Sequence, residues 1–571
     1  MVTEPALPEL TDSRRLTGAN LFWDRPAAII DMACGGDPSA FIAAWQDAVT
    51  RLLKATGRGD EQLTHRTFDG GASLLVSAPI DALYSMCELN EVAFGAARAT
   101  LGGKGAADFS AEAARLAGLF AEEANPALLA LQATAARHGV PFLWDDDAVS
   151  VGHGAGAKTW PPDQLPSPEH VDWNRAGAIP VALVTGTNGK STTVRMSAAI
   201  LAAAGLRAGL TSTDWIRVGQ TILDRGDYSG TGGARTLLRH ADTEVAVLET
   251  ARGGLLRRGL GVDRASAALV TNVAADHLGD YGINTVPELV EAKFIVRRAL
   301  HGAAPLILNA DDAGCVGFAA GLDQPLAWFS LDPGHPLLRA HREAGGRAAV
   351  LEDGWLVLAE GEAKRRIIAA DEIPATLGGA ARHNIQNALG AMLLCQALGV
   401  DDDAIRTGLA AFRGDAQDNP GRSNCFEARG VRILVDFAHN EHGMRALARM
   451  VAAMQAQRRV LLMSQAGDRA DRDIRDMVNA ALEMHPDRLV TCDLPGYERG
   501  RAPGAIPALI RGFAVAAGLA PAAIDIFADP VSSVRAVLDD ARPGDLLVLL
   551  ALSQRDDVLR LIDSWRNAGA T

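Results

Sequence analysis

The chain has 571 residues, of which 48% are hydrophobic and 22% are charged, and its formal net charge is −14. This length predicts three or four domains, and the acidic balance argues against nucleic-acid or anionic-membrane partners while allowing a local anion site. The six cysteines are scattered and form no C-x-x-C pair, which predicts reduced thiols. We see neither a basic and apolar leader nor an apolar run that could span a bilayer, so we expect a cytoplasmic protein.

The first 170 residues are expected to form an N-terminal α+β domain that ends in a linker. Helical patterns occur at 40–55, 80–101 and 111–139. The segment 160–168 contains four prolines, which favour an extended connector over a packed element. This region has no chemical motif of its own, and its apolar helical stretches favour a homo-oligomer such as a dimer.

The most informative stretch of the chain is the run 184–193, which reads VTGTNGKSTT. It follows an apolar run, 179–184, and precedes a helix-like segment, 194–204. A strand, a glycine-rich turn and a helix form a phosphate cradle, because backbone N–H groups and the helix N-terminus face the phosphate oxygens. Lys190 would then reach the outer phosphates and Ser191 would hold Mg²⁺. The competing interpretation is a glycine-rich turn that only caps a helix.

Residues 171–418 are predicted to form a central domain with a mostly parallel sheet covered on both faces. Apolar strand-like runs alternate with helical segments and lie at 181–184, 245–249, 267–270 and 305–308. Glu249 ends one of these runs, where ligands bind in open α/β sheets. Its oxygens would complete a Mg²⁺ site with Ser191, since Mg²⁺ prefers hard oxygen ligands. The alternative is a surface glutamate at a strand end.

Another polar cluster follows the run 267–270, where Asp276 and His277 stand together, and Lys293 lies in the helix-like stretch beyond them. A single histidine in such a place is more often a hydrogen-bonded structural residue than a ligand. An ammonium group cannot bind a cation, so Lys293 would need chemical modification to serve as a metal ligand.

Residues 419–571 are predicted to form a C-terminal, Rossmann-like α/β domain. Asn419, Pro420, Gly421 and Arg422 mark its start. Strand-like runs follow between helical segments, at 431–435, 459–463, 488–491 and 546–552.

Several ordered motifs of this chain resemble Mur ligases. The run GTNGKST, a glutamate ending the next core strand, the pattern T-N…D-H and a following lysine resemble their central domain. The closest resemblance is to the Mur-ligase-like module of cyanophycin synthetases, through the phrases LETARGGLLRRGL, DHLG, NADD, PGRSN, DFAHN and GDRADRD. It covers about residues 178–560 and implies an α/β fold of three-domain Mur ligase architecture, with a P-loop central parallel sheet.

The resemblance implies a role for individual residues. Ser191 and Glu249 would bind one Mg²⁺, and His277 and a carbamylated Lys293 would bind a second. The expected catalytic residues are Lys190, Glu249, His277, Lys293 and Arg422, of which Arg422 would reach the γ-phosphate of ATP. The expected ATP-binding residues are Gly186, Thr187, Asn188, Gly189, Lys190, Ser191, Thr192, Asn384 and Asn387 at the adenine, Arg422, and Asp436 at the ribose.

Four further residues are expected to contact the substrate. Arg235 and Arg252 lie in or near a glycine-rich loop, and two guanidinium groups could hold a substrate carboxylate. The alternative is that both are surface arginines of a flexible loop. His439 and Asn440 are expected near Asp436, at the cleft between domains.

The resemblance implies an ATP-dependent, ADP-forming carboxylate–amine ligase that works through an acyl phosphate. It would join an amino acid such as arginine or lysine to an acidic amino acid or an Asp-containing peptide. Only about 175 residues precede the P-loop, which is too short for the N-terminal domain plus the ATP-grasp module of cyanophycin synthetases, so we expect one ligation step. A folylpolyglutamate-like or poly-γ-glutamate-like ligase is an alternative within the class. A catalytically silent nucleotide-binding scaffold or regulator of a partner synthetase is an alternative outside it.

Overall fold

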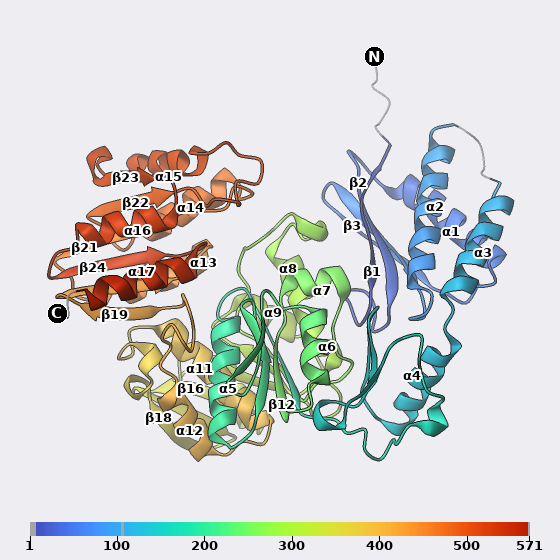
Figure 1. Cartoon of the computed structure of the whole chain (residues 1–571), viewed down its shortest axis with the longest axis horizontal. Helices are drawn as coiled ribbons and strands as arrows, with labels where there is room; N and C mark the ends of the chain where they lie inside the picture. Colours follow the sequence, from blue (N-terminus) through green and yellow to red (C-terminus); the bar gives the residue numbers. More distant parts are fainter. Residues whose placement is uncertain (1–6, 104–107, 569–571) are drawn as a thin grey trace.

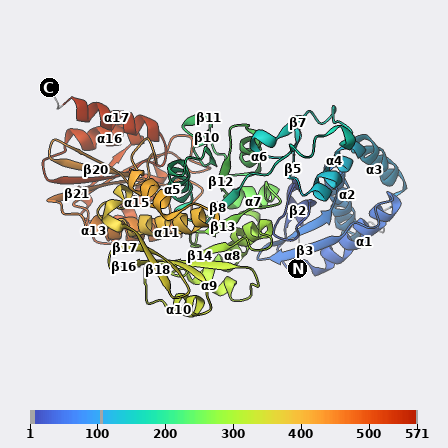
Figure 2. The same cartoon turned by 90° about the horizontal axis from the view of Figure 1, so that it is seen from below.

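The computed structural model describes residues 7–103 and 108–568 of the chain. The strands of these residues form four sheets, and Figures 1 and 2 show three lobes, with the central domain between the N-terminal and C-terminal regions. This arrangement confirms the expected multi-domain α/β architecture. Among the described residues, none of the helices combines the length and the apolar character that a membrane span requires.

The N-terminal region contains an antiparallel sheet of four strands in the order β1-β2-β4-β3. Its core includes Trp45, whose indole N–H donates to Asn90 Oδ1 at 2.8 Å. The strands are β1 (Glu9–Leu16), β2 (Ala27–Ala33), β3 (Leu63–Phe68) and β4 (Gly71–Ser77). The helices packed with them are α1 (Ser39–Ala55) and α2 (Leu83–Leu101). A second small sheet holds β5 (Phe142–Trp144), β6 (Val149–Val151) and β7 (Lys158–Trp160).

The expectation of a single helical stretch over 111–139 is wrong, because the chain breaks it into two helices. These are α3 (Ser110–Glu123) and α4 (Pro126–His138). Pro126 has no N–H for a preceding helical turn and suits the first turn of a new helix. Asn125 caps that helix by accepting a hydrogen bond from Leu128 N at 3.0 Å.

The central domain is built on an eleven-stranded sheet in the order β11-β10-β9-β12-β8-β13-β14-β15-β16-β17-β18. Strands from β9 to β16 in this order are parallel, and antiparallel hairpins extend both edges. The parallel strands are β8 (Val181–Thr185), β9 (Ala208–Thr211), β12 (Val245–Glu249), β13 (Ala267–Val270), β14 (Leu306–Asn309), β15 (Leu326–Ser330) and β16 (Arg347–Glu352). The edge strands are β10 (Trp215–Val218), β11 (Thr221–Arg225), β17 (Trp355–Glu360) and β18 (Ala363–Ala369).

Helices cover both faces of this sheet, as its continuous apolar strands require. One face packs against α5 (Lys190–Ala203), α11 (Arg382–Ala397) and α12 (Asp402–Ala411). The other packs against α6 (Thr231–Arg239), α7 (Arg252–Arg258), α8 (Val286–Lys293) and α9 (Ala313–Ala319). A short helix, α10 (Pro336–Glu343), lies between β15 and β16 in sequence. The strands expected at 181–184, 245–249, 267–270 and 305–308 are all present.

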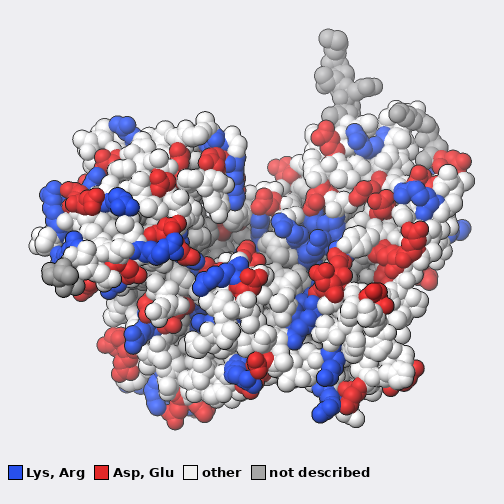
Figure 3. Space-filling model, in the orientation of Figure 1, with Lys and Arg blue, Asp and Glu red and all other residues white. Residues whose placement is uncertain are grey.

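The C-terminal domain is a six-stranded sheet in the order β19-β20-β24-β21-β22-β23, parallel except for β19. Its strands are β19 (Asn424–Ala428), β20 (Val431–Asp436), β21 (Arg458–Met463), β22 (Arg488–Cys492), β23 (Ile524–Phe527) and β24 (Asp545–Leu550). One face packs against α13 (Glu441–Ala452), α14 (Asp471–Leu482) and α15 (Ala505–Ala516). The other packs against α16 (Pro530–Asp539) and α17 (Arg555–Asn567). Figure 3 shows a deep notch between this domain and the N-terminal region.

Candidate nucleotide and metal site

The turn between β8 and α5 has the backbone of a phosphate cradle. Gly186 and Gly189 have φ angles of 142° and 88°, a region that side chains strongly disfavour. A Cβ on Gly186 would collide with Thr271, and one on Gly189 would collide with Asn387. The helix then begins at Lys190, so its free N–H groups face the turn.

Two residues that follow β13 hold the turn in place. Thr271 Oγ1 donates to the carbonyl of Asn188 at 2.6 Å, and Asn272 Nδ2 donates to the same oxygen at 3.0 Å. The side chain of Asn272 also accepts from the backbone N–H of Asn188 at 3.0 Å. The T-N motif was visible in the sequence, but only the structure shows that it fixes the turn.

The side chains of the cradle are placed at its mouth. Lys190 Nζ donates to the carbonyl of Thr187 at 3.0 Å, so its charge lies over the turn. Ser191 Oγ lies 3.4 Å from Thr213 Oγ1, and Thr192 Oγ1 accepts from Asn419 at 3.1 Å. Lysine and serine therefore stand where a triphosphate and its cation would need them.

Glu249 is the clearest sign of a cation site. The register of β12 and β8 sets it beside Val184, at the strand end that leads into the cradle. The residue is 2% exposed, and neither of its carboxylate oxygens has a hydrogen-bond partner among the residues that the structure describes. A buried carboxylate without partners is costly, and a hard cation such as Mg²⁺ would satisfy both oxygens. The residues present thus fit the metal that the sequence predicts.

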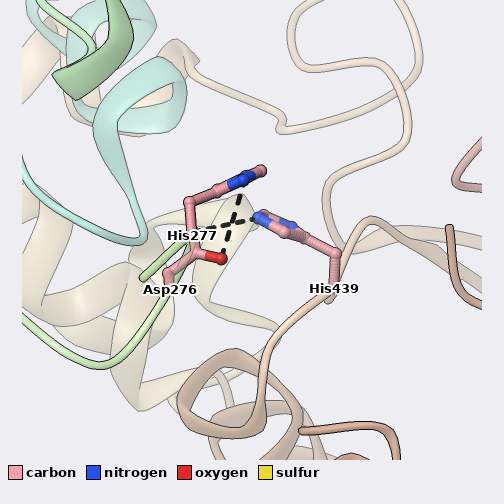
Figure 4. Close-up of side chains that lie close together, drawn as sticks. All are labelled: Asp276, His277 and His439. Carbon is pink, nitrogen blue, oxygen red and sulfur yellow. Dashed lines mark ion pairs between the residues drawn. The ribbon is translucent and has the colours of Figure 1, made fainter. Parts of the chain in front are cut away.

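A second cluster joins the central and C-terminal domains. The ligand atoms of Asp276, His277 and His439 lie within 4.8 Å of one another, and Figure 4 shows the three side chains pointing toward one another. Arg469 closes this group, because its guanidinium donates to Asp276 Oδ1 at 2.9 Å and lies 3.2 Å from His277 Nε2. The contacts of the described residues thus join His277 to Asp276 and Arg469, and not to Lys293.

Burial and neighbouring charges shift the pKa values of Asp276 and His277. Burial lowers the pKa of His277 to about 4, so the imidazole is neutral at pH 7 and keeps a lone pair for a ligand. Burial would raise the pKa of Asp276, but its hydrogen bond with His439 and the positive charge of Arg469 hold it well below its usual value. Asp276 therefore stays ionised and draws the two domains together.

Lys293 lies at the base of the cradle. It is 4% exposed, and its Nζ donates to the carbonyl of Gly186 at 2.8 Å. Burial, followed by the charge of Lys190, holds the pKa of the Lys293 ammonium well below its usual value. A neutral amine is the form that reacts with CO₂, so this position suits the carbamylation that the resemblance to Mur ligases implies. The hydrogen bond to Gly186 also gives the unmodified lysine a structural role.

We therefore expect ¹³C-bicarbonate to produce a carbamate signal in the NMR spectrum of the wild-type protein. Lys293→Arg should lack this signal, because a guanidinium stays protonated and does not form the carbamate. The same spectrum of Lys190→Arg serves as the control, since that variant keeps Lys293. An identical signal in Lys293→Arg would show that another amine is modified.

The residues expected at the adenine and the ribose hold local structure. Asn384 Nδ2 donates to the carbonyl of Ala375 at 2.8 Å, and Asn387 Nδ2 donates to Asn384 Oδ1 at 3.1 Å. Asp436 accepts from the backbone and hydroxyl of Ser423 at 2.8 and 3.0 Å. The contacts of Asn384, Asn387 and Asp436 with a nucleotide stay predictions. In the structure, the two asparagines stabilise the start of α11 beside the cradle, and Asp436 holds the segment that carries Arg422.

Arg422 lies beside the cradle, although it belongs to the segment that leads into the C-terminal domain. Its guanidinium donates to Asp214 Oδ2 and to Thr213 Oγ1, both at 2.9 Å. Since Thr213 is next to Ser191, this position agrees with the predicted reach toward phosphate. The sequence did not single out Thr213 or Asp214, because no motif marks the turn that carries them.

The four expected substrate residues lie in different places. Arg252 binds the carbonyl of His277 and, at 2.7 Å, Asp280, so it braces the loop of the second cluster. His439 belongs to that cluster. Asn440 and Asn188 exchange two amide hydrogen bonds of 3.1 and 3.2 Å, which join the cradle to the C-terminal domain.

Arg235 lies apart from the other three expected substrate residues. It is 6% exposed, donates to Thr17 Oγ1 at 3.1 Å and lies over the ring of Trp144. Burial lowers its pKa to about 10. These contacts belong to the junction with the N-terminal region, so we leave Arg235 out of the proposed site.

A cavity of about 1110 Å³ lies between the N-terminal region and α7. Glu88 and Glu91 of α2 and Glu122 of α3 line its N-terminal side, while Arg257 and Arg258 of α7 line the other. In Figure 3, basic side chains gather near the centre of the face, next to acidic groups of the N-terminal region. The first residue of α7, Arg252, touches the loop of His277, so the helix connects this cavity to the cluster of Asp276, His277 and His439 over about 9 Å.

Comparison with known proteins places this fold and site in a class of ligases. Residues 184–395 match the Mur ligase middle domain, and residues 421–551 match the Mur ligase glutamate ligase domain. The chain belongs to the Mur ligase family, which confirms the resemblance found in the sequence.

Cyanophycin synthetases are among its curated relatives. The protein of Trichormus variabilis is 37% identical over 376 residues, which are 66% of this chain and 41% of that protein. The chain thus spans about two fifths of the length of these relatives. The UDP-N-acetylmuramate–L-alanine ligase of Bordetella pertussis is 28% identical over 64% of this chain and 73% of its own. A solved structure of E. coli FolC with DHPP and ADP covers 68% of this chain and 89% of its own at 20% identity and a TM-score of 0.51, a likeness of fold.

Proposed function

We propose that the chain is an ATP-dependent, ADP-forming ligase that joins a carboxylate to an amine through an acyl phosphate. The observation that carries the proposal is Glu249, a buried carboxylate without partners, beside a glycine-rich cradle that carries Lys190 and Ser191. The match to both Mur ligase domains supports it. So does the relation to cyanophycin synthetases.

The residues of the site would act by orientation and by charge. Lys190 and Arg422 would neutralise the phosphates while a substrate carboxylate attacks the γ-phosphate. This attack forms the acyl phosphate and releases ADP, and an amine then displaces phosphate to form the amide. Ser191 and Glu249 would hold one Mg²⁺, and His277 with a carbamylated Lys293 a second; such ions supply charge neutralisation at the phosphates. The segment of Arg422 and the contact of Asn440 with Asn188 would keep the C-terminal domain over the cradle and exclude water from the anhydride.

The basic side of the cavity beside α7, which Arg257 and Arg258 form opposite the glutamates of the N-terminal region, supports an acidic amino acid or an Asp-containing peptide as the carboxylate substrate. Arg257 and Arg258 line the cavity at the end of the helix whose first residue touches the His277 loop. Guanidinium groups there would hold carboxylates that do not react, and leave one to reach the cradle. An amino acid such as arginine or lysine is the proposed amine.

Phosphate release tests the function directly. The purified protein is mixed with ATP, Mg²⁺, aspartate or short Asp-containing peptides, and each amino acid in turn, and products are identified by mass spectrometry. A ligase gives phosphate only when both substrates are present, and gives a product whose mass is the sum of both less water. Nucleotide binding without phosphate release in every mixture would instead favour a silent nucleotide-binding scaffold or regulator.

Arg257→Glu is expected to raise the KM for an Asp-containing peptide about tenfold and to leave the KM for ATP unchanged. The reversal puts a carboxylate where the substrate carboxylates would bind, and like charges at such a site cost about 1–2 kcal/mol. Initial rates of phosphate release measure both constants. Arg347→Glu, an exposed arginine on β16 that pairs with Glu360, is the control. An unchanged peptide KM in Arg257→Glu would place the carboxylate substrate elsewhere.

A further inference from the structure

Asp214 forms ion pairs with three arginines that come from three separate parts of the chain. Its carboxylate lies in the turn between β9 and β10 and is 7% exposed. The partners are Arg195 of α5, Arg422 and Arg555 at the start of α17. Because the last two accompany the C-terminal domain, one carboxylate ties that domain to the helix that begins at the cradle.

The same group of side chains touches the phosphate-binding helix. Arg422 donates to Thr213 Oγ1 at 2.9 Å, and this hydroxyl lies 3.4 Å from Ser191 Oγ. Arg195 donates to Asn419 Oδ1 at 2.8 Å. Asn419 is itself 1% exposed, so the segment that precedes the C-terminal domain is fixed to the helix by buried hydrogen bonds.

The network has more positive than negative charge. Burial would raise the pKa of Asp214, but the charges of Arg422, Arg195 and Arg555 hold it well below its usual value. Burial and the charge of Arg422 lower the pKa of Arg195 to about 10, against the opposing effect of Asp214 and Glu249. Three guanidinium groups on one carboxylate repel one another, and an anion bound beside Ser191 would relieve that repulsion.

We propose that Asp214 is a positioning residue that orients Arg422 and Arg555 toward the outer phosphate of a nucleoside triphosphate in the cradle. The proposal rests on the proposed function only in its assignment of ATP to this site. The carboxylate has two opposite effects. Its negative charge weakens the binding of any polyanion nearby, whereas its hydrogen bonds hold the guanidinium groups in a geometry that distinguishes the triphosphate from the diphosphate.

Asp214→Asn separates these two effects. We expect the variant to bind the fluorescent nucleotide mant-ADP as tightly as the wild type or up to about threefold more tightly, because a negative charge is gone. We expect its preference for mant-ATP over mant-ADP to fall about fivefold or more, because the arginines are no longer oriented. Titrations in Mg²⁺ without any other substrate measure both. Asp214→Glu, which keeps the carboxylate, should retain more of the preference.

Arg555→Met provides a second variant, in which Asp214 keeps two of its arginines. Loss of a positive charge should weaken binding of mant-ATP several-fold and of mant-ADP less. The preference for mant-ATP then falls as in Asp214→Asn, but the affinity for mant-ADP changes in the opposite direction. Asp545→Asn is the matched control. It removes a buried carboxylate that pairs with Arg458 at 2.6 Å and lies at the first residue of β24, whereas Arg555 follows the last. This control should change thermal stability without changing the ratio of the affinities for mant-ATP and mant-ADP.

An equal loss of affinity for both nucleotides in a folded Asp214→Asn protein, or an unchanged ratio, would overturn the proposal and leave Asp214 a structural ion pair. If that variant does not fold, unchanged mant-ATP binding in Arg555→Met would overturn it in the same way. A wild-type protein that binds mant-ATP but never releases phosphate would refute the ligase activity and leave the role of Asp214 standing.

Discussion

Lys190→Ala is expected to reduce ATP-dependent phosphate release by at least about 10²–10³-fold, the effect of losing one charged group that stabilises a transition state. The ammonium group lies over the glycine turn and donates a hydrogen bond to the carbonyl of Thr187. Without this ammonium group, the partly buried site has one cation less to stabilise the negative charge that develops on the phosphates in the transition state. Initial rates with the substrates that support wild-type turnover measure the loss.

The fold should survive this change, since Lys190 takes part in no buried ion pair within 7–103 and 108–568 and only donates a hydrogen bond to the carbonyl of Thr187 there. The thermal unfolding midpoint is expected to stay close to that of the wild type. Lys364→Ala is the control, because it removes a lysine of the same domain that pairs with Glu352 at the surface and should not change the rate. Phosphate release at the wild-type rate in Lys190→Ala would show that the cradle does not serve catalysis.

Glu249→Gln should abolish turnover and at the same time stabilise the metal-free protein. The neutral amide cannot replace a carboxylate at a divalent cation, so we expect a loss of about 10²–10³-fold. In EDTA the wild type must keep an unpartnered carboxylate buried, and removing its charge should raise the unfolding midpoint by about 2–4 °C for each kcal/mol gained.

Thermal unfolding with and without Mg²⁺ separates these two effects. Adding Mg²⁺ should stabilise the wild type, because a ligand that binds only the folded state shifts the midpoint upward. Glu249→Gln should show little of this shift. If the variant gained as much from Mg²⁺ as the wild type, the cation would bind elsewhere.

Local sequence patterns predicted most of the fold. The apolar runs at 181–184, 245–249 and 267–270 became β8, β12 and β13 because each is buried on both faces of the sheet. Periodicity alone joined 111–139 into one stretch, whereas Pro126 starts a new helix there. The antiparallel hairpins at the sheet edges were not predicted, because the prediction relied on strands that alternate with helices and no helix separates the two strands of a hairpin.

The candidate site was predicted only as far as its residues belong to motifs. The glycine turn, Glu249 and Lys293 follow strands or lie on helices whose positions the patterns indicate. The sequence assigned no role to Asp214 or to Arg469. Their partners are up to 341 residues away in the chain, and no local pattern reports contacts between such distant segments.

The amino-acid sequence by itself predicted the glycine-rich turn, the positions of the main parallel strands and the family, because glycine spacing, apolar runs and short motifs are each contained in a few residues. The tertiary structure alone decided which charges meet. It placed Arg235 with the N-terminal region, joined His277 to Asp276 and His439, and gathered three arginines on Asp214. Those pairings depend on how whole domains pack, since a buried charge is stabilised only by the partners that the folded chain brings to it.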